Sequence, residues 1–188
     1  MKLNRIVMLG SCLFLLSAVA ARSADADENW QTLITKYTII CFHSEADMSK
    51  FDDDIDYSPG SGFTALFGGS GGGDSTTKLV RKIDSLFLRA QDILAMRKYI
   101  RKVRIQIYAN NDQLQNAYHQ EIKSTDSSDN RAWYDFNQHT IYVQVKDLNE
   151  GMLAHEMAHA IIDNYFQVRP PSATAEILAR YVDAHLND

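Results

Sequence analysis

The chain has 188 residues, of which 45% are hydrophobic, and a formal net charge of −5. That length and apolar content suit one domain that buries its own core. The acidic balance argues against nucleic acid or anionic lipid as the main partner.

The first 20 residues have the features of a secretory signal peptide. Lys2 and Arg5 precede an apolar run, and Ala-Val-Ala at 18–20 fits the small-residue rule for signal peptidase cleavage. The apolar run is shorter than the roughly 20 residues that span a bilayer, so it does not predict a membrane anchor. We therefore expect export to the periplasm or the extracellular space, with no stable membrane insertion once the signal is removed.

Two details of this processing stay open. Cleavage could fall as late as Ala24, and the stretch LGSC, which ends at Cys12, has some likeness to the acylation site of a lipoprotein, although the apolar run continues beyond it. Residues 25–188 are then expected to form a single domain. Its one cysteine, Cys41, lies in an apolar run, which predicts a buried inert thiol and no internal disulfide.

The domain begins with short apolar segments and a glycine-rich stretch. KYTIICFH at 36–43 is rich in β-branched and aromatic residues, which predicts a strand. Ser44 and Asp47 are spaced like the start of a helix. Residues 58–75 hold seven of the nine glycines and predict a flexible loop. No Gly-Lys-Ser/Thr ends this loop, so it does not predict a phosphate site.

A long helix is predicted over residues 77–100, where apolar residues recur at helical spacing. The basic residues of this segment, including Arg97 and Lys98, are expected on its wet side. KVRIQIYA at 102–109 alternates apolar and polar residues and predicts a strand with one wet face, and 111–120 predicts a short helix.

The remaining elements are a polar loop, a hairpin and two helices. RAWYDF and TIYVQVK flank Asn-Gln-His at 137–139 and predict a β-hairpin. Asp147 and Glu150 could cap the helix that follows, and Ser172 or Thr174 could cap the last helix, SATAEILARYVDAHL. The order of elements predicts a small α+β domain with one mixed sheet packed with helices.

The motif HEMAH at 155–159 predicts a hydrolytic zinc site. On a helix, His155 and His159 lie one turn apart on one face, at a distance that suits two nitrogens of one tetrahedral zinc. Glu156 is rotated away from that line, so it is badly placed as a ligand and well placed to contact a water on the metal. The surrounding residues are largely apolar, and buried His and Glu side chains need partners there.

A catalytic zinc takes three protein ligands and one open position, so a third ligand must come from downstream. Glu176 is preferred, because it lies among small and apolar residues on a helix that VRPPS can fold back against the first. His185 and Asp183 remain alternatives, and Asp183 could instead support a ligand by hydrogen bonding. Asp163, one turn after His159, is expected to hydrogen-bond an imidazole N–H.

HEMAHAIID followed by AEILARYVD resembles the gluzincin metallopeptidases, of which thermolysin is a member, and in particular small secreted bacterial forms of the peptidase-MA-like group. In that family a glutamate on the next helix completes the zinc site, often in a Glu-x-x-Ala-x-Tyr context that Glu176, Ala179 and Tyr181 match. An aspartate at the position of Asp163 also recurs. The resemblance covers about residues 132–186 and implies a minimal zincin-like domain with a hairpin strand beside the cleft.

The resemblance implies zinc-dependent hydrolysis of peptide bonds, with Glu156 as the general base. The substrate would be a peptide or protein, held as an added strand along an open edge of TIYVQV. Tyr142, Tyr165, Tyr181 and His185 are candidates to stabilise the oxyanion, and the sequence does not choose among them.

Two other functions stay open. Zinc could merely hold two helices together in an exported module, although a structural site usually has four ligands, often with cysteine, and no cysteine lies near the motif. The chain could also be a lapsed peptidase that binds a partner, since the C-terminal domain usual in the family has no counterpart in these residues. The sequence indicates neither an oligomeric state nor a cleavage preference.

Overall fold

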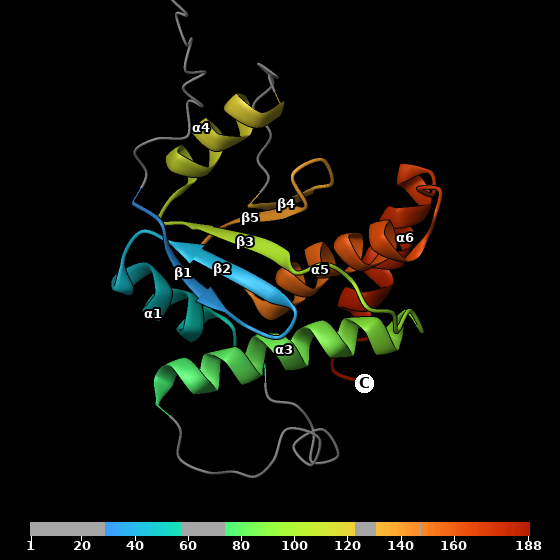
Figure 1. Ribbon diagram of the computed structural model, residues 1–188, viewed down its shortest axis with the longest axis horizontal. Coiled ribbons are helices and arrows are strands. Elements are labelled where there is room, and N and C mark those ends of the chain that lie inside the picture. Colours follow the sequence, from blue (N-terminus) through green and yellow to red (C-terminus); the bar gives the residue numbers. More distant parts are fainter. Residues whose placement is uncertain (1–28, 58–73, 123–130, 147) are drawn as a thin grey trace, which may run out of the picture.

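The computed structural model describes residues 29–57, 74–122, 131–146 and 148–188, and the structural statements below concern these ranges. They form a five-stranded mixed sheet and five helices, which confirms the predicted α+β class (Figure 1). The strands are β1 (Gln31–Ile34), β2 (Thr38–Phe42), β3 (Val103–Tyr108), β4 (Ala132–Asp135) and β5 (Thr140–Gln144). The helices are α1 (Glu45–Asp54), α3 (Ser75–Ile93), α4 (Asn111–Ile122), α5 (Glu150–Tyr165) and α6 (Ser172–Ala184).

Several predictions fall outside the described ranges. They concern the signal peptide with Cys12, nearly all of the glycine-rich stretch, the polar loop before the hairpin, and Asp147. Within the described ranges, none of the helices combines the length and the apolar content needed to cross a membrane.

The sheet has the strand order β1-β2-β3-β5-β4. β2, β3 and β5 run parallel, with Ile105 of β3 between Ile40 and Ile141, whereas β1 and β4 pair antiparallel at the two edges. The sequence prediction of an open edge on TIYVQV is therefore wrong, because the hairpin folds β4 onto the outer side of β5. The exposed edge on this side of the sheet belongs to β4.

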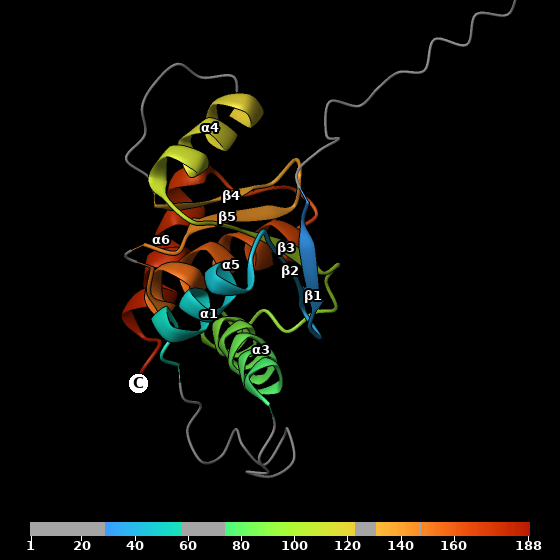
Figure 2. The same ribbon diagram turned by 90° about the vertical axis from the view of Figure 1, so that its left-hand side faces the viewer.

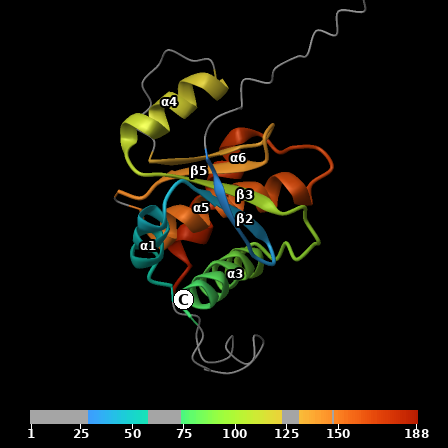
Figure 3. The ribbon, with the colours of Figure 1, turned by 60° about the vertical axis from the view of Figure 1, so that its left-hand side comes forward.

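Helices cover both faces of the sheet, with more of them on one face than on the other. α1, α3 and α5 lie on one face and α4 lies on the other, as Figures 2 and 3 show. α6 packs against α5, on the side of α5 away from the middle of the sheet (Figure 1). The carrier of the HEMAH motif, α5, is thus held between the sheet, α3 and α6.

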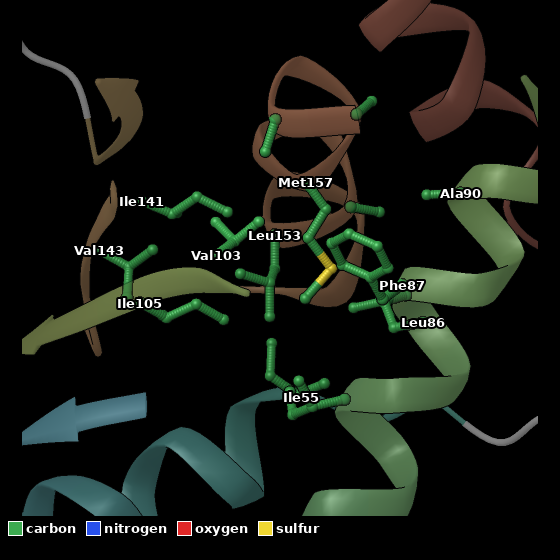
Figure 4. Close-up of a cluster of buried hydrophobic side chains, with 14 of the residues drawn as sticks. Ile55, Leu86, Phe87, Ala90, Val103, Ile105, Ile141, Val143, Leu153 and Met157 are labelled. Carbon is green, nitrogen blue, oxygen red and sulfur yellow. The ribbon is translucent and has the colours of Figure 1, made fainter. Parts of the chain in front are cut away.

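The main core lies between the sheet and the layer of α3 and α5. Because strand side chains alternate between faces, Ile141 and Val143 of β5 point into this core, while Tyr142 lies on the α4 side. Figure 4 shows the buried apolar side chains that join β3, α5 and α3: Val103, Ile105, Leu153, Met157, Leu86 and Phe87. Full burial of one such side chain contributes roughly 1.5–3 kcal/mol, so this layer fixes α5 firmly against the sheet.

A smaller aromatic cluster lies beneath α4. Trp133 of β4 stacks on Tyr142 of β5, with ring centroids 4.6 Å apart, and Tyr118 of α4 meets Trp133 edge-on at 5.1 Å. Leu114 of α4 is fully buried in the same cluster. These contacts hold α4 against the hairpin strands, on the face of the sheet opposite to α5.

The sequence pattern predicts that helix α3 continues to residue 100. In the structure the helix ends at Ile93. Ala95 adopts a left-handed φ of 53°, and the N–H of Met96 reaches back to the carbonyl of Gln91 at 2.9 Å. A left-handed residue with such a reversed hydrogen bond closes the C-terminus of a helix. Arg97 and Lys98 consequently lie in the loop after α3 and not on its wet side.

The predicted N-cap residue is confirmed for one of three helices. The Ser44 hydroxyl accepts the N–H of Asp47 at 3.2 Å and caps α1 as predicted. α5 is capped by Asn149 and α6 begins after Pro171, which offers no side-chain hydrogen bond. The predictions of caps for these two helices are therefore wrong: Glu150 is the first residue of α5, and Ser172 and Thr174 lie inside α6.

Candidate metal centre

Two consecutive helices bring the predicted ligands together. α5 and α6 pack side by side, as Figures 1 and 2 also show. Small buried side chains on both helices favour a close approach of their axes: Ala154, Ala158, Ala175 and Ala179. His155 and His159 come from neighbouring turns of α5, and Glu176 comes from the first half of α6.

His155, His159 and Glu176 converge on one point. The two Nε2 atoms are 3.2 Å apart, and Glu176 Oε2 lies 3.6 Å from His155 Nε2 and 3.4 Å from His159 Nε2. Donor atoms bound to one tetrahedral zinc at about 2.0–2.1 Å lie roughly 3.3 Å apart, so all three spacings fit a zinc ion. Within the described ranges, these residues form the group of metal-binding side chains close enough to share one ion.

The three side chains are partly exposed, and the pKa shifts of His159 and Glu176 favour the forms that bind metals. Burial and the neighbouring His155 lower the pKa of His159, which favours the neutral imidazole that binds metals. Partial burial acts to raise the pKa of Glu176. The hydrogen bond from Arg180 and the two imidazoles outweigh this and hold that pKa below its ordinary value, so Glu176 is ionised at neutral pH.

Glu156 lies beside these donors and is not one of them. It stands where α5 meets β4, and its carboxylate accepts a hydrogen bond from the backbone of Tyr134. Burial raises the pKa of Glu156 to about 8; the Tyr134 hydrogen bond opposes the rise, and the Glu176 carboxylate adds to it. A carboxyl group with this pKa holds its proton at neutral pH, and a positive charge beside it would favour the carboxylate form that a general base needs.

Asp163 connects α5 to the edge strand. Its Oδ2 accepts the hydroxyl of Tyr134 at 3.0 Å, and its Oδ1 lies 3.7 Å from Arg169 Nε. The predicted hydrogen bond from an imidazole N–H, such as that of His159, to the Asp163 carboxylate is not among these contacts. The contacts tie the C-terminal part of α5 to the strand whose backbone reaches Glu156.

Asp183 faces the beginning of α5. A Cβ placed on Gly151 would lie 2.3 Å from Asp183 Oδ1, so the carboxylate rests against the helical turn before His155. Asp183 does not converge with the three donor atoms, and neither does His185.

The candidates for stabilising an oxyanion each contact another aromatic ring. Tyr181 and His185 stack on each other at the C-terminal end of α6, with ring centroids 4.0 Å apart. Tyr165 packs on the ring of Phe166 at the end of α5. Tyr142 belongs to the aromatic cluster on the other face of the sheet.

Arg180 is a residue of the site that sequence reasoning missed. Its Nε donates to Glu176 Oε1 at 2.8 Å, one helical turn away. A glutamate followed four residues later by an arginine is a common helix-surface pair, and this spacing is the signal that could have found it.

His139 is a second missed residue, in the hairpin turn next to the site. It is only 4% exposed and adopts a φ of 53°. Its Nε2 lies 3.1 Å from the carbonyl of Arg101, and its Nδ1 lies 2.8 Å from the hydroxyl of Tyr134 and 3.3 Å from the amide nitrogen of Asn164. His139 therefore braces the hairpin against α5.

A cavity of about 320 Å³ lies elsewhere, among β1, α1 and α3, and is lined in part by Leu33, Met48 and Leu79. None of the donor residues lines it, so the site is defined by its side-chain geometry and not by this cavity.

No family model matches the chain, and neither a curated protein nor a solved structure is significantly similar to it. The likeness to gluzincins consequently rests on the motif residues and on the convergence of their donor atoms.

Proposed function

We propose that the chain is a zinc-dependent metallopeptidase of the gluzincin type, acting on a peptide or protein substrate. One observation carries the proposal: Glu156 stands beside three donor atoms that lie 3.2, 3.4 and 3.6 Å apart. His155, His159 and Glu176 would hold the metal, and Glu156 would be the general base.

The zinc ion and the residues of the chain would have separate roles in the reaction. A bound zinc ion supplies a Lewis acid that polarises a carbonyl group and lowers the pKa of a water to near neutrality. Glu156 takes a proton from the attacking water and passes it to the leaving nitrogen. The backbone of Tyr134, which acts on the Glu156 carboxylate, would help to orient it for both transfers.

The edge of β4 supports a peptide as the substrate. The outer side of β4 has no strand partner among the described residues, and extended peptides bind such edges by main-chain hydrogen bonds. Because the backbone of Tyr134, within β4, contacts Glu156, a peptide added along this edge would pass the general base.

A zinc that only holds α5 and α6 together is the second candidate function. Structural zinc sites are usually closed by four ligands, whereas three partly exposed donors meet in the described part of this chain. A lapsed peptidase that binds a partner would keep the same geometry and differ only in turnover.

Glu156→Gln separates the peptidase from the other two candidates. In a peptidase, the variant should keep its zinc and its fold but lose hydrolysis of an unfolded protein substrate by about 10²- to 10⁴-fold, because an amide cannot accept the proton. Glu150→Gln, in the first turn of the same helix, is the matched control and should retain activity. Loss of zinc from Glu156→Gln would make Glu156 a ligand and contradict the proposal. Zinc-loaded wild type without turnover would indicate the structural site or the lapsed peptidase.

We also propose that the protein is exported to the periplasm or the extracellular space. The basic start, the apolar run and Ala-Val-Ala at 18–20 support this. The N-terminus of the exported protein should lie between Ala21 and Asp25, as determined by N-terminal sequencing. Intact Met1 in the exported fraction would rule out cleavage, and an acylated Cys12 at the N-terminus would identify a lipoprotein instead.

A further inference from the structure

The two carboxylate oxygens of Glu176 have different partners. Oε2 faces the imidazoles, 3.6 Å from His155 Nε2 and 3.4 Å from His159 Nε2. Oε1 accepts the Nε–H of Arg180 at 2.8 Å. One oxygen of the carboxylate is therefore available to a metal ion, and the other is bound to an arginine on the same helix.

We propose that Arg180 is a positioning residue that holds Oε1 and so restricts Glu176 to binding the metal through Oε2 alone. The inference rests on the proposed function, since it concerns the same metal centre. The inference gives Arg180 a role of its own: it determines how many coordination positions of the metal are filled by protein atoms.

The number of occupied positions decides whether such a site can work. A carboxylate can bind a metal through one oxygen or through both, and a catalytic zinc must keep a position open for water or substrate. With Oε2 alone, Glu176 and the two imidazoles fill three positions. If Oε1 also turned toward the metal, the carboxylate would crowd the remaining position.

The contact with Arg180 is suited to prevent that turn. A charge-assisted hydrogen bond of 2.8 Å is short, and its direction fixes the rotation of the carboxylate about its last side-chain bond. Arg180 is well exposed, at 74% of its side chain, and exposed pairs at this helical spacing add little to fold stability. Its removal should therefore leave the fold intact and change the geometry of the site.

The chain offers a matched control for the loss of an exposed arginine. Arg97 Nε also donates to a carboxylate on a nearby residue, Asp92 Oδ1, and its side chain is 69% exposed. Asp92 lies in the last turn of α3 and Arg97 in the loop after it, and neither is a donor residue, so Arg97→Met removes an equivalent contact without touching the site.

The test uses cobalt(II), whose visible absorption is strong in four-coordinate sites and weak in sites of higher coordination. Metal-free full-length wild type, Arg180→Met, Arg180→Lys and Arg97→Met are each titrated with cobalt(II) alone. We expect one equivalent to bind to each protein, with the absorption of Arg180→Met lower by about twofold or more as Glu176 binds through both oxygens. Arg180→Lys, which can still donate to Oε1, should restore most of the intensity.

The outcomes separate this inference from the proposed function. If Arg180→Met binds cobalt with the spectrum of wild type and Arg97→Met, Arg180 does not set the coordination, although the metal centre stands. If Arg180→Lys resembles Arg180→Met, the hydrogen bond to Oε1 is not the cause and the inference fails. If wild type binds no cobalt, the metal centre and the role of Arg180 fail together.

Discussion

Asp183 on the last helix rests directly against Gly151 in the first turn of α5, where a Cβ would come within 2.3 Å of Asp183 Oδ1. The side chain of Asn149, which caps the same helix, would lie 3.3 Å from that Cβ. Only a residue without a side chain leaves room for this carboxylate, and the N-terminus of a helix favours a negative charge. The contact sets the position of α6 along the axis of α5.

A double-mutant cycle tests this contact. Alanine normally stabilises a helix by up to about 1 kcal/mol relative to glycine. Gly151→Ala should nevertheless fail to stabilise the wild type, because the methyl group displaces Asp183. In an Asp183→Ala background the same change should become stabilising, with a coupling of about 0.5 kcal/mol or more in urea unfolding. Equal effects in the two backgrounds would show that the residues do not interact.

Ala95→Gly should stabilise the protein by about 0.5–1 kcal/mol, because a residue with a Cβ is strained at left-handed φ and glycine is not. Thermal and urea unfolding measure the change. Ala173→Gly, at an exposed position inside α6, serves as the control and should destabilise. A loss of stability in Ala95→Gly would mean that α3 does not end in this left-handed turn.

His139 should make stability depend on pH. Burial lowers its pKa below the ordinary 6.5, although the hydrogen bond to the Arg101 carbonyl opposes the shift. The folded protein therefore binds the proton less readily than the unfolded chain. This contribution to stability is present above about pH 6.5 and is lost as the pH falls through the lower folded pKa.

His139→Asn removes the titrating group while tolerating the left-handed backbone. Between about pH 8 and pH 5, wild type should lose more unfolding free energy than this variant. Identical losses would assign the acid sensitivity to other groups.

Removal of the metal should lower the melting temperature. Zinc at about 100 times its dissociation constant adds about 2.7 kcal/mol, or roughly 5–10 °C for a domain of this size. Glu176→Ala should lose this zinc-dependent shift and Asp163→Asn should keep most of it, as measured by scanning calorimetry with zinc or with a chelator. A shift that survives in Glu176→Ala but disappears in His185→Ala would identify a different third ligand.

The sequence predicts the centre of the site better than its surroundings. His155 and His159 are fixed to one face by helical periodicity alone, and Glu176 stands out as a carboxylate among apolar neighbours. Arg180 is indistinguishable in sequence from the many exposed arginines that pair within a helix. The placement of Asp183 against Gly151 depends on how α6 is set along α5, which no local pattern specifies.

The errors in the fold have similar causes. β1 is mostly exposed and shows no alternation that would distinguish it from a loop. A hairpin pattern predicts that two strands pair but not which of them joins the rest of the sheet, so the sequence alone does not show that β4 lies at the edge. The end of α3 escapes prediction because Ala95 occupies a position that glycine usually marks.

The position of β4 next to the candidate site has a consequence for the effects of amino-acid substitutions along the chain. Glu156, the three donors and the strand next to Glu156 all lie between Ala132 and Arg180, in about one continuous quarter of the chain. Most of their contacts join segments close in sequence, and such contacts form with a small loss of chain entropy. Substitutions in the first hundred residues should therefore alter how much folded protein is present more than how each folded molecule works. Screens of variants that normalise activity to the folded fraction would separate these two effects along the chain.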